Sequence, residues 1–256
     1  MADILVCIKR VPDLGGEISL TPDSMSVDTS RLGHTVSPHE ECAVELAIQA
    51  AKASGGEATV LSLGSADSLE QIRDALAVGC TGAVLVEAEA ERFGPADVAA
   101  AIADVVRAHE QEGRTYDLIL LGNDAADTGD FQVGIRLAYA LGRPVVAGVS
   151  TVEVAGDRVI ARAAAAEGTD IFEVDLPAVM TVMEGGVEPR YPSIPGRMKA
   201  KRVAVETVTP SVSPAGPGRV RLKLPPVQPS QVQILGHGPE AAPAVVDLLE
   251  SLGVSR

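Results

Sequence analysis

Short apolar runs alternate with longer amphipathic segments along the first 145 residues. The short runs are rich in Val, Ile and Leu, which is typical of strands buried in a parallel sheet. The longer segments have helical periodicity, and Gly or Pro closes most of them. The predicted strands are 3–9, 58–63, 82–86 and 118–121, and the predicted helices are 38–53, 68–78, 95–109 and 132–141. This order predicts an α/β fold with a doubly wound, mostly parallel, Rossmann-like sheet.

Two stretches depart from this alternation. Residues 11–37 are rich in Gly, Pro, Ser, Asp and Thr, and we expect a hairpin there around 17–20 and 26–29. Residues 149–183 have strand patterns with no helix between them and a turn at 155–158. An antiparallel addition to the sheet is the simplest interpretation of this second stretch.

The C-terminal part differs from the rest of the chain in composition. Residues 207–230 are dense in Pro and Val, with Gly and Ser, which predicts an extended arm. Residues 238–252 predict a terminal helix with an apolar stripe, which either packs on its own chain or wraps a partner subunit. The expected organisation is an α/β domain over 1–205 and an arm with its helix over 206–256.

Composition narrows the function classes. The chain has 256 residues, 46% of them hydrophobic, and a formal net charge of −14, so nucleic acid and anionic membranes are poor partners. Residues 187–202 are a basic island within this acidic chain. Three cysteines without a CxxC pair argue against a disulfide framework or a zinc site. The N-terminus resembles neither a signal nor a transit peptide, and no apolar run could cross a bilayer. We therefore expect a cytoplasmic protein.

The main candidate binding site is a bend rich in Gly and Asp over 122–134. It follows the predicted strand 118–121 and opens a helix, and ligands of open parallel sheets bind at such strand ends. Small residues let the backbone approach a phosphate, and free amides at a helix start receive an anion. An ordinary capped turn is equally compatible with the pattern. The stretches 6–9, 37–40 and 62–65 lie at other strand or helix ends and are weaker candidates.

No catalytic constellation is visible in the sequence. The four histidines are scattered, and neither HExxH nor GxSxG occurs. Cys7 falls in a buried strand and is predicted to be inert core. We expect neither a catalytic centre nor a metal site.

A loop stiffened by three prolines follows the strand predicted at 177–183. Pro189, Pro192 and Pro195 bracket Ile194, and a basic segment comes next. An apolar side chain on a pre-ordered loop can anchor a partner with little loss of entropy. A rigid turn before a short basic helix explains the same residues.

Several long motifs resemble the beta subunits of electron transfer flavoproteins. The most specific is L-P-A-V-M-T-V at 176–182, followed by E-P-R-Y-P-S-I-P and M-K-A-K. Others are V-C-I-K-R-V-P-D, S-P-H-E-E-C-A-V-E-L-A, I-R-D-A-L-A-V-G, E-R-F-G-P and L-I-L-L-G-N-D-A-A-D-T-G-D-F-Q-V-G. The similarity covers roughly residues 3–205.

The resemblance implies an adenine-nucleotide alpha-hydrolase-like fold and a subunit that binds AMP without redox role. An alpha subunit would hold the redox FAD, and the arm would wrap that subunit. Electrons would come from acyl-CoA or related dehydrogenases and pass, through ETF-quinone oxidoreductase, to the respiratory chain. The matching nucleotide positions are Cys7, Ser37, Pro38, His39, Glu40, Leu63, Gly122, Asn123, Asp124, Ala125, Ala126, Asp127, Thr128, Gly129, Asp130, Phe131, Gln132 and Val133. The matching docking positions are Pro189, Arg190, Tyr191, Ile194, Pro195, Met198, Lys199 and Lys201.

Two alternatives stay open, the first because of departures from the family pattern and the second because the alternation of strands and helices allows it. The Gln-Val-Gly at 132–134 is similar to electron-bifurcating members, which bind a second FAD and use NADH, although Phe131 and its neighbours differ from theirs. Leu14 stands where some members carry an aromatic residue near the flavin, and Gly196-Arg197 replaces Asn-Ile in the docking loop. A stand-alone nucleotide-binding module of the universal-stress class is the other alternative.

Overall fold

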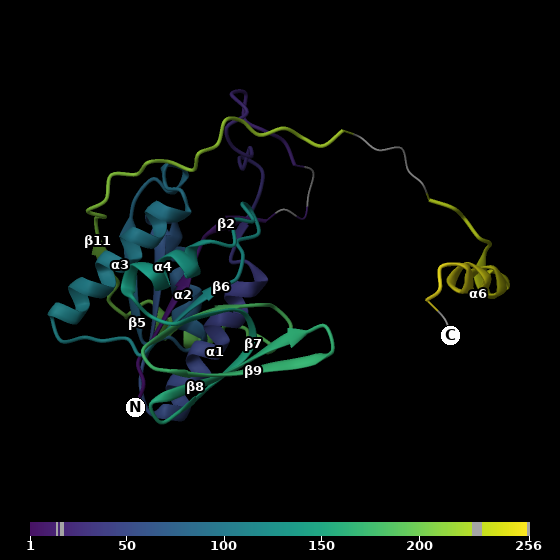
Figure 1. Cartoon of the computed structure of the whole chain (residues 1–256). Coiled ribbons are helices and arrows are strands. Elements are labelled where there is room, and N and C mark those ends of the chain that lie inside the picture. Colours follow the sequence, from purple (N-terminus) through teal and green to yellow (C-terminus); the bar gives the residue numbers. More distant parts are fainter. Residues whose placement is uncertain (14, 16–17, 227–231, 255–256) are drawn as a thin grey trace. The chain divides into compact units, whose positions relative to one another are not determined.

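The computed structural model describes residues 1–13, 15, 18–226 and 232–254. The chain forms two compact units, Met1–Leu222 and Lys223–Arg256. The first unit contains a nine-stranded sheet in the order β11-β5-β4-β1-β6-β10-β7-β8-β9. Figure 1 shows the chain with most of its helices and strands labelled. Its strands are β1 (Ile4–Ile8), β4 (Ala58–Gly64), β5 (Gly82–Glu87), β6 (Leu118–Gly122), β7 (Val145–Ala155), β8 (Arg158–Ala165), β9 (Gly168–Asp175), β10 (Ala178–Val182) and β11 (Glu206–Val208).

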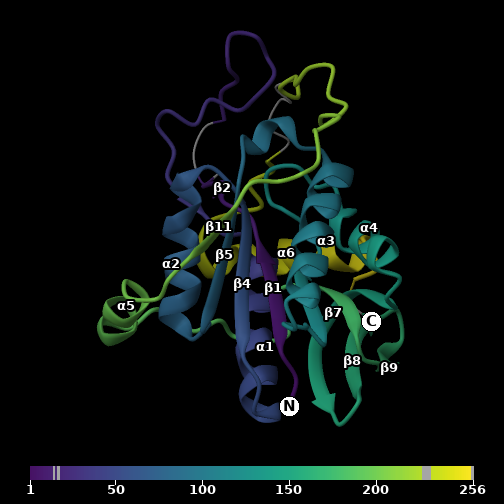
Figure 2. The same cartoon turned by 90° about the vertical axis from the view of Figure 1, so that its left-hand side faces the viewer.

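Helices cover both faces of this sheet, as a doubly wound fold requires. The helices are α1 (Pro38–Ser54), α2 (Leu69–Val78), α3 (Pro95–Gln111), α4 (Val133–Leu141) and α5 (Ile194–Ala200), with short 3-10 turns at Ala66–Ser68 and Ala90–Arg92. Alternate residues of β1 show the two layers. Ile4 and Val6 pack into the core formed with α1 and α2, whereas Leu5 and Cys7 pack into the core formed with α3 and α4. Figure 2 shows α1 and α3 on opposite sides of β1.

The expected strand and helix alternation is confirmed, but the account of residues 149–183 needs a correction. Only β8 and β9 are antiparallel additions. β10 inserts parallel to β6, and β7 lies parallel to β10. The sequence shows no helix between these strands, because the antiparallel β8–β9 hairpin takes the place of a crossover helix.

The loop between β1 and α1 contains the expected hairpin, as far as its residues are described. Leu20 and Val27 form an antiparallel bridge. A second short ladder, between β2 (Val11–Pro12) and β3 (His34–Thr35), closes the base of this loop.

The segment after β11 belongs to the first compact unit as far as Leu222, and we call residues 209–222 the strap. The Ser211 hydroxyl donates to Asp104, and the amides of Ala215 and Gly216 donate to Asp97 near the start of α3. The strap runs past α3 to the end of the sheet where the 11–37 loop lies (Figure 2). There the Leu222 amide donates to the Ser24 carbonyl.

The second unit contains a 3-10 turn (Gly238–Ala241) and the expected terminal helix, α6 (Ala242–Ser251). Its apolar side chains Val245, Val246, Leu248 and Leu249 are 38–50% exposed. Wrapping of a partner by this helix stays a prediction. In the described part of the chain, no helix has the length and apolarity needed to span a membrane.

Candidate functional site

A cavity of about 550 Å³ opens at the carboxyl ends of the central parallel strands. Cys7 and Ile8 of β1, Leu63 of β4, and Leu121 and Gly122 of β6 contribute to its wall. β1 is the first strand of the sheet, and the chain continues to β4 on one side and β6 on the other, so the strand order reverses there. Open α/β sheets bind their ligands at such a switch point, and this volume suits a small molecule.

The bend between β6 and α4 forms the polar side of the cavity. Lys9 at the end of β1 binds Asp127 with 2.7 Å between Nζ and Oδ1. The Thr181 hydroxyl of β10 donates to the Asn123 side chain at 2.6 Å, which fixes the beginning of the bend. Phe131 has φ = 52° and is 55% exposed, so a bulky residue with a left-handed backbone lies on the wall of the cavity. The bend is therefore fastened to strands on both sides of it.

Glu40 in the first turn of α1 lies against this bend. Its Oε2 accepts hydrogen bonds from the Ser37 hydroxyl at 2.8 Å and from the Ser37 amide at 3.2 Å, which caps the helix. Gly122 packs directly on Glu40, since a Cβ at Gly122 would lie 2.6 Å from the Glu40 Cγ. Burial raises the pKa of Glu40 from its ordinary value of 4.5 to about 8, against the opposing effects of the Ser37 hydrogen bonds and the Lys9 charge. The cavity thus contains a carboxyl group that is largely protonated at neutral pH.

This carboxyl group should make folding stability depend on pH. Between about pH 4.5 and 8 the folded chain keeps a proton that the unfolded chain releases, so the free energy of unfolding falls as pH rises through that window. Glu40→Gln removes this titration. From about pH 5 to pH 8 its free energy of unfolding should therefore fall less than that of the wild type, by a margin on the order of a few kcal/mol. Urea unfolding at several pH values measures it. Glu112→Gln, at an exposed position after α3, is the control and should keep the wild-type slope.

The proline-bracketed loop before α5 is exposed at its tip and anchored at its base. Tyr191 is 94% exposed and Ile194 is 79% exposed. At the base, Arg190 makes a two-pronged ion pair with Glu45 of α1, with 2.6 Å between Nε and Oε2 and 2.5 Å between Nη2 and Oε1. Burial opposes ionisation of Glu45, but the hydrogen bonds from Arg190 and Gln49 outweigh it and lower the pKa of Glu45. The base of the loop is therefore fixed to α1, and its apolar residues Tyr191 and Ile194 are exposed.

Gly196 and Arg197, in the first turn of α5, contact the neighbouring helix α2. A Cβ at Gly196 would lie 2.2 Å from the Ala77 carbonyl oxygen, so a larger residue could not make the same approach. Arg197 pairs with Asp74 of α2 at 2.7 Å. Arg73 of α2 also donates to the carbonyls of Ala200 and Val203 at the end of α5. α1 and α2 together support the loop.

Comparison with known proteins identifies the family that these features belong to. Residues 24–213 match the model of the electron transfer flavoprotein domain. The chain belongs to the electron transfer flavoprotein family. Its relatives are named electron transfer flavoprotein subunit beta. It is 35% identical over 234 residues to that of Syntrophomonas wolfei, with 90% of this chain and 89% of the relative covered. It is 36% identical to that of Homo sapiens over 211 residues, 81% of each chain, and 33% identical to that of Bacillus subtilis over 204 residues, 80% and 77% of the two chains.

The structure gathers most of the positions that match the family's nucleotide site around one cavity. Those on its wall are Cys7, Glu40, Leu63, Gly122, Asn123, Asp124, Ala125, Asp127, Thr128, Asp130, Phe131, Gln132 and Val133. Those off its wall are Ser37, Pro38, His39, Ala126 and Gly129. Ser37 is buried behind the wall, where its hydroxyl contacts the Asp124 carbonyl oxygen at 3.4 Å. Burial, with a further effect of Glu40, raises the pKa of the Cys7 thiol, so this residue lines the site as an apolar group.

The positions that match the family's docking loop lie in and around α5. Pro189 is half-buried at the base, and Ala200 at the end of the helix is buried. The remaining docking positions are exposed, namely Arg190, Tyr191, Ile194, Pro195, Met198, Lys199 and Lys201. Leu14 lies outside the described residues.

Part of the cavity wall comes from segments that sequence reasoning did not assign to it. Ser26, Val27 and Thr29 of the first loop and Pro217, Arg219 and Leu222 of the strap line it. Phe93 and Pro95, from the E-R-F-G-P motif, line it as well. The alternation of strands and helices carries no signal for these irregular segments, because only their tertiary contacts bring them to the strand ends.

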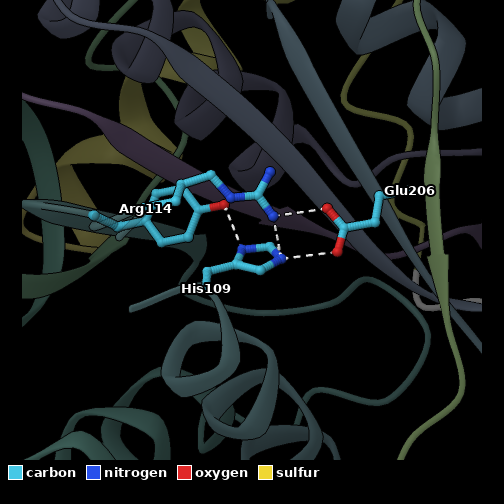
Figure 3. Close-up of polar contacts among 4 residues, drawn as sticks. His109, Arg114 and Glu206 are labelled. Atoms are coloured by element: carbon cyan, nitrogen blue, oxygen red, sulfur yellow. Dashed lines mark hydrogen bonds and ion pairs between the residues drawn. The ribbon is translucent and has the colours of Figure 1, made fainter. Parts of the chain in front are cut away.

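Four polar side chains join α3 to β11 at the edge of the sheet, where the strap begins (Figure 3). His109 is buried, with Nδ1 2.9 Å from the Tyr116 hydroxyl and Nε2 2.9 Å from Glu206 Oε1. Arg114 contacts His109 and binds Glu206 Oε2 at 2.7 Å. Burial of Glu206 is outweighed by the hydrogen bonds from Arg114 and His109, which lower its pKa. This cluster fastens the edge strand and hence the root of the strap.

Removing the carboxylate of Glu206 should destabilise β11 and the start of the strap. Glu206→Gln loses charge-assisted bonds at a partly exposed site and should cost about 1 kcal/mol of unfolding free energy. Amide hydrogen exchange in 206–222 should speed up, while exchange in β1 stays unchanged. Glu173→Gln, which removes an exposed ion pair with Arg158, should leave both unchanged. Equal exchange in Glu206→Gln and wild type would mean that backbone pairing alone holds β11.

No group of His, Cys, Asp and Glu within the described ranges could hold a metal ion.

Proposed function

We propose that this chain is the beta subunit of a heterodimeric electron carrier whose alpha subunit holds the redox FAD. The heterodimer accepts electrons from acyl-CoA dehydrogenases and related flavin dehydrogenases and passes them, through ETF-quinone oxidoreductase, to the respiratory chain. The observation that carries this proposal is the pre-ordered loop, which presents Ile194 at 79% exposure while Arg190 holds its base on α1. A surface anchor separate from the cavity suits a carrier that recognises a protein and not a small substrate.

We propose that AMP fills the cavity as a structural nucleotide and supplies no redox chemistry. The cavity fits such a ligand because its wall combines apolar side chains with buried polar atoms that have no hydrogen-bond partner among the described residues. Leu63 and Phe93 offer apolar contact to a base. Asp124 Oδ1 and Arg10 Nε are buried atoms with no hydrogen-bond partner among the described residues. A nucleotide's hydroxyl groups and phosphate would satisfy atoms of both kinds.

A bifurcating subunit with a second FAD is the competing proposal, favoured by the Gln-Val-Gly at 132–134. The glycine of this motif has a packing role of its own, because a Cβ at Gly134 would lie 2.3 Å from the Thr181 Cγ2. Phe131 also occupies part of the cavity wall. Both observations favour AMP. Family membership favours either subunit type over a stand-alone nucleotide-binding module.

The three cysteines are buried free thiols, which suits a reducing compartment, and we propose the cytoplasm.

Co-expression with a candidate alpha subunit tests the proposed function. We expect a yellow heterodimer whose flavin absorbance bleaches when acyl-CoA and its dehydrogenase are added. The beta chain expressed alone should be colourless. A colourless pair, or a pair whose flavin NADH reduces without any dehydrogenase, would refute the carrier proposal.

A further inference from the structure

The side of the cavity away from the sheet is built by the strap and the first loop together. Pro217, Arg219 and Leu222 line it from the strap, and Ser26 and Thr29 line it from the loop. The two segments are joined, because the Arg219 guanidinium donates to the Met25 carbonyl at 2.8 Å and the Leu222 amide donates to the Ser24 carbonyl at 2.7 Å. The strap is therefore a wall of the ligand site.

Two arginines on the cavity wall have no acidic partner within the described ranges. Lys9 is paired with Asp127, whereas neither Arg10 nor Arg219 forms an ion pair with a described residue. Arg10 Nε is buried and has no partner there, and Arg219 donates to a neutral carbonyl, that of Met25. His34 also lines the cavity. Burial lowers the pKa of His34 most, and the positive charge of Arg10 lowers it further.

Unpaired guanidinium groups at partly buried positions are costly unless an anion meets them. In a chain with a net charge of −14, carboxylates are abundant, yet these two cations face a cavity instead. Guanidinium groups bind phosphates through paired N–H donors, as they bind carboxylates. The wall also carries the carboxyl groups of Glu40, Glu91, Asp124, Asp127 and Asp130. Asp127 is paired with Lys9, and neither arginine is paired with any of these groups. The two unpaired guanidinium groups therefore suit a phosphate-bearing ligand.

We propose that Arg10 and Arg219 bind the phosphate of the nucleotide in the cavity, so that the strap supplies part of the nucleotide site. This inference rests on the proposed nucleotide-binding function. Val133 and Gly134 at the start of α4 line the same cavity, and their amides, which have no acceptor within the helix, would also donate to the phosphate. Asp124, whose Oδ1 has no partner in the described chain, is left to accept from a hydroxyl or amino group of the ligand.

Binding of AMP and of adenosine to the nucleotide-depleted heterodimer tests this proposal, because only AMP carries the phosphate. Arg219→Gln and Arg10→Gln should each weaken AMP binding by about 10- to 100-fold in titration calorimetry and leave adenosine binding within about twofold. Arg219→Lys should retain part of the AMP affinity. Arg221→Gln is the matched control, since Arg221 is an exposed strap residue off the cavity wall, and it should bind both ligands as the wild type does.

The outcomes separate this inference from the function on which it rests. Equal weakening of AMP and adenosine by Arg219→Gln would show a structural role for the strap and overturn the inference, and so would unchanged AMP affinity. The wild type could instead bind FAD or ADP but not AMP, with the affinity for that nucleotide falling by about 10- to 100-fold in the arginine variants. This result would support phosphate binding by Arg10 and Arg219 and would refute AMP as the ligand. A wild type that binds no nucleotide would refute both.

Discussion

Replacing Ile194 by aspartate should lower the rate constant for electron transfer from an acyl-CoA dehydrogenase to the assembled heterodimer by about 30-fold or more. Interface anchors of this kind contribute about 2 kcal/mol or more, and a charge at their centre adds a desolvation cost on docking. Ile194 is 79% exposed at the start of α5, so the substitution removes no core contact. Folding, nucleotide content and flavin absorbance should therefore stay at wild-type values.

Stopped-flow bleaching of the flavin at increasing dehydrogenase concentration measures this effect. Val220→Asp is the matched control, because Val220 is an apolar side chain at 88% exposure that lines neither the docking loop nor the cavity. Ile194→Leu should keep most of the rate. A full rate in Ile194→Asp, with saturation at the same dehydrogenase concentration, would show that docking uses another surface.

Gly122→Ala should damage the nucleotide site and the fold together. The added Cβ would lie 2.6 Å from the Glu40 Cγ and 3.2 Å from the Glu40 amide nitrogen, so the first turn of α1 must move away from the bend. Overpacking of this kind costs about 1–3 kcal/mol, which corresponds to a fall in melting temperature of about 3–10 °C for a chain of this size. The nucleotide that co-purifies with the heterodimer should fall well below one per heterodimer.

Gly33→Ala is the control for this substitution. A Cβ at Gly33 meets nothing closer than 3.9 Å, and the residue is exposed in the loop before α1. Its melting temperature and nucleotide content should match the wild type. A Gly122→Ala chain with full nucleotide content would mean that the contact between Glu40 and the bend does not shape the cavity.

Helix α1 connects the cavity with the proline-bracketed loop. Glu40 in its first turn packs against the bend, and Glu45 one turn later holds Arg190. A single motif, S-P-H-E-E-C-A-V-E-L-A, therefore carries residues for both features. Such local patterns, with their caps and apolar periods, predict the parallel core and the strand ends.

The parts that the sequence did not predict depend on long-range contacts. The parallel pairing of β10 between β6 and β7 follows no helix in the chain, so alternation could not reveal it. The strap reaches the cavity through Asp97, Asp104 and Ser24, which are distant in sequence from residues 209–222. Arg219 lies in an irregular segment with no sequence pattern around it. Its position on the cavity wall is therefore visible only in the structure.

The nucleotide content of the purified heterodimer tests the central claim most directly. Mild denaturation followed by mass spectrometry of the released small molecules should give one FAD and one AMP per heterodimer. Two FAD molecules and no AMP would contradict a simple electron carrier with a structural nucleotide in this cavity. The absence of any adenine nucleotide besides a single FAD would contradict the assignment of the cavity itself.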